Sequence, residues 1–263
     1  MNHLPLLWIH GWGMHAGIWQ AIRRQWPSES TLALDLPGYG GIPAVNGGLD
    51  DLVHDVLHRA PEYFDVCGWS LGGLLAQRMA LLAPHRIRRI ALIGATPCFT
   101  TRKRWNCGIE PAVLTAFAAE LAHAYEPTLK RFLALQVHGD TAARASLALL
   151  RTQLFARGRP DADVLQQGLD ILLETDLRAE LPKLQQPLLL IQGTRDSLTP
   201  LCAAEWLSRQ IAGSRLVAVA GAAHAPFLSH EAQCVVALRE FLSDKPLDPP
   251  SPAIARREDA HAK

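Results

Sequence analysis

Six short apolar runs, each bounded by Gly, Pro or Asp and followed by sequence with a helical pattern, constrain the fold of this chain most strongly. They span residues 6–10, 31–34, 64–68, 89–94, 188–193 and 216–220. Strands that alternate with helices form parallel sheets, because a crossover between parallel strands has room for a helix. The sequence therefore predicts an α/β fold, with a mostly parallel, twisted sheet of six strands flanked by helices.

The interval between residues 94 and 188 is far longer than a single crossover helix requires. Within it, apolar residues recur at helical spacing in four groups: Leu114, Phe117, Leu121 and Tyr125; Phe132 and Leu135; Leu147, Leu150 and Leu154; Leu165, Leu169 and Leu172. We expect residues 101–183 to form a helical lid, inserted into a core made of residues 1–100 and 184–243. The alternative is a packed subdomain that contacts no substrate. Residues 244–263 have too few apolar side chains to pack, and we expect a disordered tail.

Composition excludes several classes of protein. The 26 Lys and Arg residues balance 25 Asp and Glu residues, so a surface for nucleic acid is not expected. No apolar run reaches the ~20 residues that a membrane helix needs, and residues 4–9 are too short for a signal peptide, so we expect a cytoplasmic protein without a membrane partner. The five cysteines are widely spaced and odd in number, which predicts reduced thiols: Cys67, Cys98, Cys107, Cys202 and Cys234.

The strongest chemical signal is the string GWSLG at residues 68–72, directly after an apolar run and directly before a helical pattern. A serine at a sharp turn from strand to helix is exposed to substrate, and its small neighbours let the two elements cross closely. The helix that starts there directs its N-terminal amides toward negative charge near the serine hydroxyl. This context predicts that Ser70 is a nucleophile.

A serine nucleophile needs a base to take its proton and a carboxylate to orient that base. Asp196 follows the run at 188–193, and His224 lies in a turn of small residues after the run at 216–220. The chain order Ser, Asp, His is typical of α/β-hydrolases. We therefore predict His224 as the base and Asp196 as its partner, with Asp170 and Asp176 as the spare carboxylates.

The string HGWG at residues 10–13 follows the first run, at the position from which this architecture supplies one amide of its oxyanion hole. The backbone N–H groups of Trp12 and Leu71 are the predicted donors. No dinucleotide fingerprint, P-loop or metal-ligand spacing is present, so the sequence predicts neither a metal nor another cofactor.

Together these motifs resemble the α/β-hydrolase superfamily, which implies an α/β-hydrolase fold with a lid inserted after the sixth strand of the fold, here the run at 89–94. The strings HGWGM, GWSLGGL, RFLALQ, GLDIL and AAHAPF further resemble the carboxylesterases of biotin synthesis that hydrolyse pimeloyl-acyl carrier protein methyl ester. RFLALQ, at residues 131–136, is the string that separates this group from other hydrolases. Because the first apolar run starts at Leu6, we expect the short hairpin that usually precedes the first strand in that family to be missing or reduced here.

The resemblance implies an acidic acyl carrier protein as partner, and charge in the insertion agrees with it. Between residues 101 and 160, nine Lys and Arg residues face four Asp and Glu residues. By resemblance, Arg131 and Arg144 would dock the carrier, with Arg151 and Lys130 as further candidates, and Phe132 would line the acyl channel beside Trp12 and Leu71. For Phe132 the alternative is ordinary core of the insertion, and for the basic residues it is a solvated helix face.

Two other functions remain open at this stage. The first is another enzyme with the same triad, either a general short-chain carboxylesterase or a C–C bond hydrolase. The second is a binding protein without catalysis on this scaffold. Nothing in the sequence requires more than a monomer.

Overall fold

A computed structural model describes residues 4–243, so the expected tail lies outside the described residues. Its six strands are all parallel, in the order β2-β1-β3-β4-β5-β6. They are β1 (Leu6–Ile9), β2 (Thr31–Leu34), β3 (Phe64–Trp69), β4 (Ile87–Ile93), β5 (Leu188–Gly193) and β6 (Arg215–Val219). Each coincides with a run from the sequence to within two residues, which confirms the predicted fold class.

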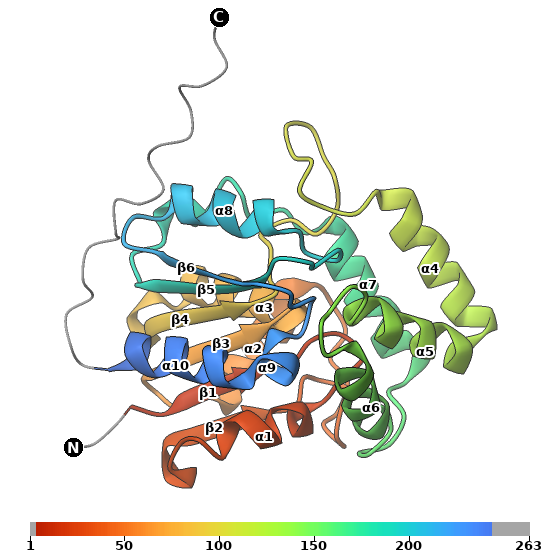
Figure 1. Cartoon of the computed structure of the whole chain (residues 1–263), viewed down its shortest axis with the longest axis horizontal. Helices are drawn as coiled ribbons and strands as arrows, with labels where there is room; N and C mark the ends of the chain where they lie inside the picture. Colours follow the sequence, from red (N-terminus) through yellow and green to blue (C-terminus); the bar gives the residue numbers. More distant parts are fainter. Residues whose placement is uncertain (1–3, 244–263) are drawn as a thin grey trace, which may run out of the picture.

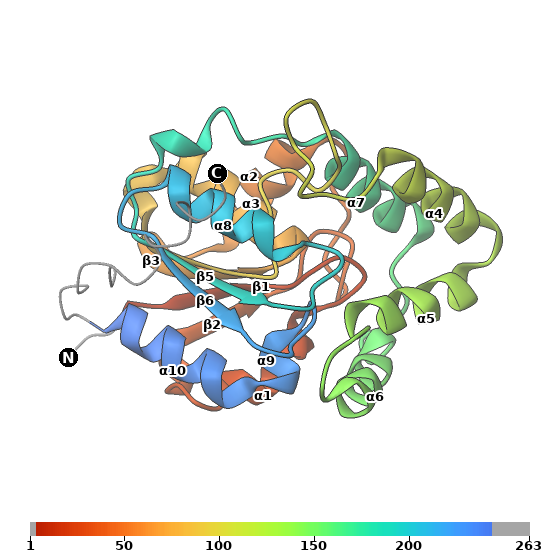
Figure 2. The same ribbon diagram turned by 45° about the horizontal axis from the view of Figure 1, so that its top comes forward.

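Helices cover both faces of the sheet (Figures 1 and 2). On one face lie α2 (Leu49–Arg59), α3 (Leu71–Leu82) and α8 (Leu201–Gln210), and on the other lie α1 (Gln20–Arg23) and α10 (Glu231–Leu242). The short α9 (Pro226–Ser229) precedes α10, and four 3-10 turns are η1 (Ala16–Trp19), η2 (Ser28–Ser30), η3 (Pro84–Arg86) and η4 (Leu181–Lys183). Because both faces are covered, β1, β3 and β5 are buried along their whole length.

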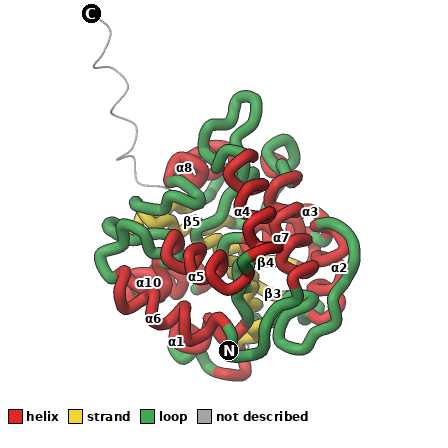
Figure 3. The backbone as a smooth tube through the Cα atoms, turned by 90° about the vertical axis from the view of Figure 1, so that its right-hand side faces the viewer, coloured by secondary structure: helices red, strands yellow, loops and turns green. Residues whose placement is uncertain are grey.

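Four helices fill the interval between β4 and β5: α4 (Pro111–His123), α5 (Tyr125–Gln136), α6 (Ala143–Leu154) and α7 (Ala162–Glu174). They lie together at one end of the sheet, and Figure 3 looks onto their outer side with the strands behind them. Pro111 occupies the first turn of α4, and the Asp161 side chain accepts a hydrogen bond from Asp163 N at the start of α7. Tyr125 begins α5 and does not extend the α4 stripe, because the chain turns at Ala124.

The expectation that all five cysteines are reduced thiols is wrong. Cys107, in the loop before α4, and Cys202, in the first turn of α8, form a disulfide with their Cα atoms 5.7 Å apart. The loop folds down onto α8, where Trp105 packs against Trp206 with ring centroids 5.5 Å apart. Because the two cysteines are 95 residues apart in the chain, their spacing gave no sign of this contact. The remaining three cysteines are buried thiols: Cys67, Cys98 and Cys234.

Candidate active site

Ser70 lies at the turn between β3 and α3, where the sequence predicted a nucleophile. Its backbone has φ 55° and ψ −120°, a conformation that residues other than glycine rarely adopt. Ser70 N donates to Ile93 O of the neighbouring strand at 3.1 Å, which helps to hold the turn in place. The hydroxyl therefore lies at the end of the sheet, at the start of α3.

Two glycines allow the close crossing at this turn. A Cβ on Gly68 would lie 2.3 Å from Gly72 O, and a Cβ on Gly72 would lie 2.3 Å from Ile9 O. Both distances are far below contact with backbone atoms, which cannot yield as a flexible side chain would. The glycines of the string GWSLG are thus required by the packing of α3 against β1 and β3.

The structure brings His224 and Asp196 together. His224 Nδ1 is 2.9 Å from Asp196 Oδ2, and both side chains are buried. Trp69 Nε1 donates to His224 O at 2.9 Å, which ties the histidine loop to the residue before Ser70. Ser70 and His224 line the same pocket, so the three predicted residues meet at one edge of the sheet.

Asp196 accepts hydrogen bonds from three residues that were not predicted from the sequence. Its Oδ2 accepts from Gln192 Nε2 and Thr199 Oγ1, each at 2.7 Å, and its Oδ1 accepts from the backbone N–H groups of Leu198 and Thr199, each at 2.9 Å. Burial alone would raise the pKa of Asp196, but His224 and the Thr199 hydrogen bonds outweigh it and hold that pKa below its usual value. Asp196 is therefore ionised at neutral pH. A polar Gln192 within a buried strand was the one signal in the sequence.

The spare carboxylates lie elsewhere. Asp170 is exposed on α7 and accepts a hydrogen bond from Gln166 Nε2, whereas Asp176 pairs with Arg178. Neither contacts His224 through a hydrogen bond or ion pair in the described part of the chain.

The loop after β1 lies beside Ser70 because β1 and β3 are neighbours in the sheet, with Ile9 opposite Gly68. At this point the strand order reverses, which is where open α/β sheets place ligands. Within residues 4–243, neither Trp12 N nor Leu71 N donates to an acceptor. Both amides are thus free to donate to a bound group, and their role as oxyanion donors stays a prediction.

His10 holds the loop after β1 in place through contacts of its ring with two backbone groups. Its buried ring accepts from Leu36 N through Nε2 at 3.0 Å, and Nδ1 lies 2.9 Å from Gly11 O. Burial lowers the pKa of His10 from its ordinary value of 6.5 to about 4. The ring is therefore neutral at pH 7 and bridges two backbone groups.

An apolar pocket opens onto Ser70 and His224. It holds about 510 Å³ of empty space, part of it open to solvent, and the insertion supplies most of its wall. The other lining residues carry no charge: Trp12, Ile109, Val113, Leu114, Phe117, Phe132, Leu135, Leu169, Leu172 and Leu198. The Phe132 ring meets the Trp12 ring edge-on, with centroids 4.8 Å apart. Leu71 is absent from this wall, so its part in the site is its backbone.

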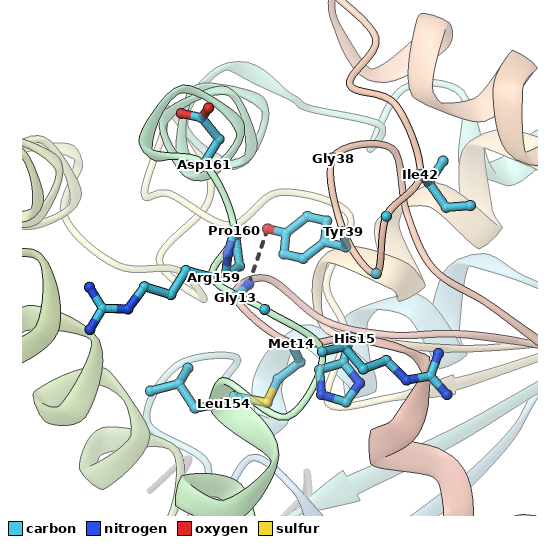
Figure 4. Close-up of a pocket in the computed structure, with 14 residues that line it drawn as sticks. Gly13, Met14, His15, Gly38, Tyr39, Ile42, Leu154, Arg159, Pro160 and Asp161 are labelled. Carbon is cyan, nitrogen blue, oxygen red and sulfur yellow. Dashed lines mark hydrogen bonds between the residues drawn. The ribbon is translucent and has the colours of Figure 1, made fainter.

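A second pocket lies beside the loop after β1, between residues 38–42 and 154–161 (Figure 4). The Tyr39 hydroxyl points to Gly13 and accepts from its N–H at 3.3 Å. Arg157 and Arg159 lie at this pocket, but each is paired, with Asp35 and Glu126 respectively. The described residues hold no cluster of three or more His, Cys, Asp or Glu that could bind a metal ion.

The four basic residues considered for docking are all exposed, but they differ in their partners. On α5, Arg131 pairs with Glu120, and Lys130 pairs with Glu126. On α6, Arg144 and Arg151 form no ion pair with any residue of 4–243. Positive charge without a partner thus lies on α6.

Comparisons with known proteins agree with this geometry. Residues 6–237 match the model of the Alpha/beta hydrolase family. The chain is 42% identical over 236 residues to the pimeloyl-(acyl-carrier protein) methyl ester esterase of Nitrosomonas europaea, which covers 89% of this chain and 94% of that protein. It is 39% identical to the protein of the same name from Aromatoleum aromaticum, over 92% of this chain and 99% of that one.

Solved structures show the same fold. An esterase from Exiguobacterium antarcticum superposes with a TM-score of 0.80 at 22% identity, over 91% of each chain. An enol-lactonase from Burkholderia xenovorans does so with a TM-score of 0.80 at 23% identity, over 92% of each chain. No helix within residues 4–243 is both long enough and apolar enough to cross a membrane.

Proposed function

The chain belongs to the alpha/beta hydrolase family and, within it, to the family of the pimeloyl-(acyl-carrier protein) methyl ester esterases, and we propose how its site performs that reaction. It is a serine carboxylesterase that converts pimeloyl-acyl carrier protein methyl ester and water into pimeloyl-acyl carrier protein and methanol, a step of biotin synthesis. The apolar pocket at Ser70 is the observation that carries the proposal.

In the proposed mechanism, Ser70 Oγ attacks the ester carbonyl while His224 Nε2 takes the hydroxyl proton. Asp196 holds the imidazolium that forms, and the N–H groups of Trp12 and Leu71 donate to the oxyanion. His224 then gives its proton to the leaving methoxide, and methanol departs. His224 then deprotonates a water molecule, which attacks the acyl-enzyme carbonyl. The imidazolium returns this proton to Ser70 Oγ as the acyl–oxygen bond breaks, which frees Ser70 and the carboxylic acid, and the acid ionises.

The chemistry of the pocket fits the substrate end that reacts. A methyl ester on a polymethylene chain is neutral and apolar, and it can enter a wall of Leu, Ile, Val and aromatic side chains. The product carries a carboxylate, which loses hydration in such a wall without gaining a charged partner. The pocket therefore favours binding of the ester over binding of its product.

We propose that the carrier docks on the exposed face of the insertion, chiefly on α6. Arg144 and Arg151 are seven residues apart and so lie on one helical face, and neither is neutralised by a neighbouring carboxylate. Arg131 and Lys130 take part more weakly, because Glu120 and Glu126 already pair with them. An exposed ion pair contributes up to about 1 kcal/mol, so two of them change KM by at most roughly 30-fold.

The test compares pimeloyl-carrier methyl ester with p-nitrophenyl acetate at low and high salt. We expect S70A to abolish turnover of both esters, and the double variant R144E/R151E to raise KM for the carrier substrate alone, most at low salt. R209E, at an exposed arginine in the last turn of α8 and outside residues 101–183, is the matched control. Equal turnover of both esters at every salt concentration would contradict the carrier assignment and leave a general carboxylesterase.

The proposed site is complete within one chain, so the enzyme works as a monomer. A partner that carries biosynthetic intermediates further implies that the enzyme acts in the cytoplasm.

A further inference from the structure

The turn between α5 and α6 lies against the loop that carries His224, although nearly ninety residues separate them in the chain. His224 N donates to Gln136 O at 3.0 Å, and Thr141 N donates to Gly221 O at 3.0 Å. Arg195 Nη1, next to Asp196 in sequence, donates to Gly139 O at 2.8 Å. The insertion thus bonds to both loops that hold the proposed His-Asp pair.

Asp140 is the one acidic side chain in this turn, and it is 9% exposed. Its Oδ2 accepts from Ala223 N at 2.9 Å, which is the amide directly before His224. Its Oδ1 accepts from Ala142 N at 2.7 Å, at the start of α6. One carboxylate therefore joins the first turn of α6 to the backbone of the histidine loop.

We propose that Asp140 is a positioning residue that holds His224 at the correct distance from Ser70. The segment from Gly221 to Ala223, directly before His224, carries no side chain larger than a methyl group, so its position depends strongly on backbone hydrogen bonds. Trp69 Nε1 and Arg195 N donate to carbonyls of this loop, and the insertion adds further hydrogen bonds. Among these, the Asp140 carboxylate satisfies two N–H groups that have no other acceptor within residues 4–243. The insertion is then part of the machinery that positions the base, in addition to covering the pocket.

This role of Asp140 rests on the proposed triad, and it predicts that turnover falls when the carboxylate is removed. Without the carboxylate, the histidine loop drifts, and a displacement of about 1 Å between reacting groups lowers the rate by roughly a hundredfold. We expect D140A to lower kcat for p-nitrophenyl acetate between tenfold and a hundredfold with KM unchanged. Labelling of Ser70 by a fluorophosphonate, which also needs the base, should slow by the same factor.

The variant D140N keeps the size of the side chain but removes its charge and one of its two acceptor oxygens. Its single oxygen can accept from Ala223 N or from Ala142 N but not from both, so kcat should lie between those of the wild type and D140A. D161A is the matched control, because Asp161 also caps a helix of the insertion but bonds only to Asp163 N. D161A should lower Tm and leave kcat and the labelling rate unchanged.

The outcomes are distinct. If D140A and D140N keep wild-type kcat while Tm falls as in D161A, the carboxylate is a helix cap and the inference is wrong. If they raise KM for the carrier ester only, Asp140 serves docking and the inference is also wrong. Should D140A fail to fold, D140N carries the measurement. A wild type that neither hydrolyses esters nor takes the fluorophosphonate would refute the proposed function itself, independently of any Asp140 variant.

Discussion

Replacing Asp196 with Asn tests whether the carboxylate sets the proton position on His224. In the wild type, Oδ2 faces three groups: His224 Nδ1 at 2.9 Å, and Gln192 Nε2 and Thr199 Oγ1 at 2.7 Å. Oδ1 faces two backbone N–H groups at 2.9 Å, those of Leu198 and Thr199. Asparagine has one acceptor oxygen, which will stay with the two amides, so its NH₂ group will point toward His224.

The consequence for catalysis follows from the tautomer. An NH₂ group beside Nδ1 donates to it, which places the ring proton on Nε2, where the hydroxyl of Ser70 would need an acceptor. Loss of the correct tautomer in a Ser-His-Asp triad lowers kcat roughly 10⁴-fold, or about 5 kcal/mol in the activation free energy. KM should change little, because Asp196 does not line the pocket.

The assay is steady-state hydrolysis of p-nitrophenyl acetate at pH 8, with the rate of fluorophosphonate labelling of Ser70 as a second readout. D170N is the matched control, because Asp170 was the spare carboxylate and is exposed on α7. A D196N enzyme that keeps kcat within tenfold of the wild type would refute this assignment of Asp196, and a large loss in D170N would transfer the role to that residue.

Two further predictions concern stability. Because burial lowers the pKa of His10 to about 4, the unfolded chain binds a proton between pH 6.5 and 4 that the folded chain does not. The free energy of unfolding should therefore fall by at most roughly 3 kcal/mol as pH drops through that window, and H10Q should show a shallower dependence in urea titrations; equal slopes would contradict it. Reduction of the Cys107–Cys202 disulfide, which closes a loop across 95 residues, should lower the free energy of unfolding by up to about 4 kcal/mol. C107S/C202S should then show no response to reductant, and a wild type that also shows none would sink the prediction.

The strands were predictable because their signal is local. A buried parallel strand needs a continuous apolar run, and Gly, Pro or Asp ends it, so 188–193 and β5 coincide residue for residue. Ser70 and His224 were predictable for a related reason, since each follows such a strand in a turn of small residues. These two site residues were therefore predictable because each follows a strand that positions it at the sheet edge.

Contacts that form only in the folded chain left no comparable trace. Gln192 and Thr199 hold Asp196, but only the folded loop brings their donors to its carboxylate. Asp140 had counted simply as one of four acidic residues in a basic segment, whereas the structure places it against Ala223. A side chain whose partner lies eighty residues away has no periodicity or motif to reveal it.

The pairing of charged residues is likewise not predictable from the local sequence. The excess of Lys and Arg in residues 101–160 is a property of composition, yet a carrier protein would meet only the charge that the fold leaves unpaired. Helix packing sets Glu120 of α4 against Arg131 of α5, and the turn before α7 sets Arg159 against Glu126. Arg144 and Arg151 are exposed on α6 and form no ion pair within residues 4–243. Of the two residues that the resemblance named first, the fold pairs Arg131 and leaves Arg144 without an ion pair. We therefore propose α6, whose N-terminal end Asp140 connects to the histidine loop, as the main docking surface.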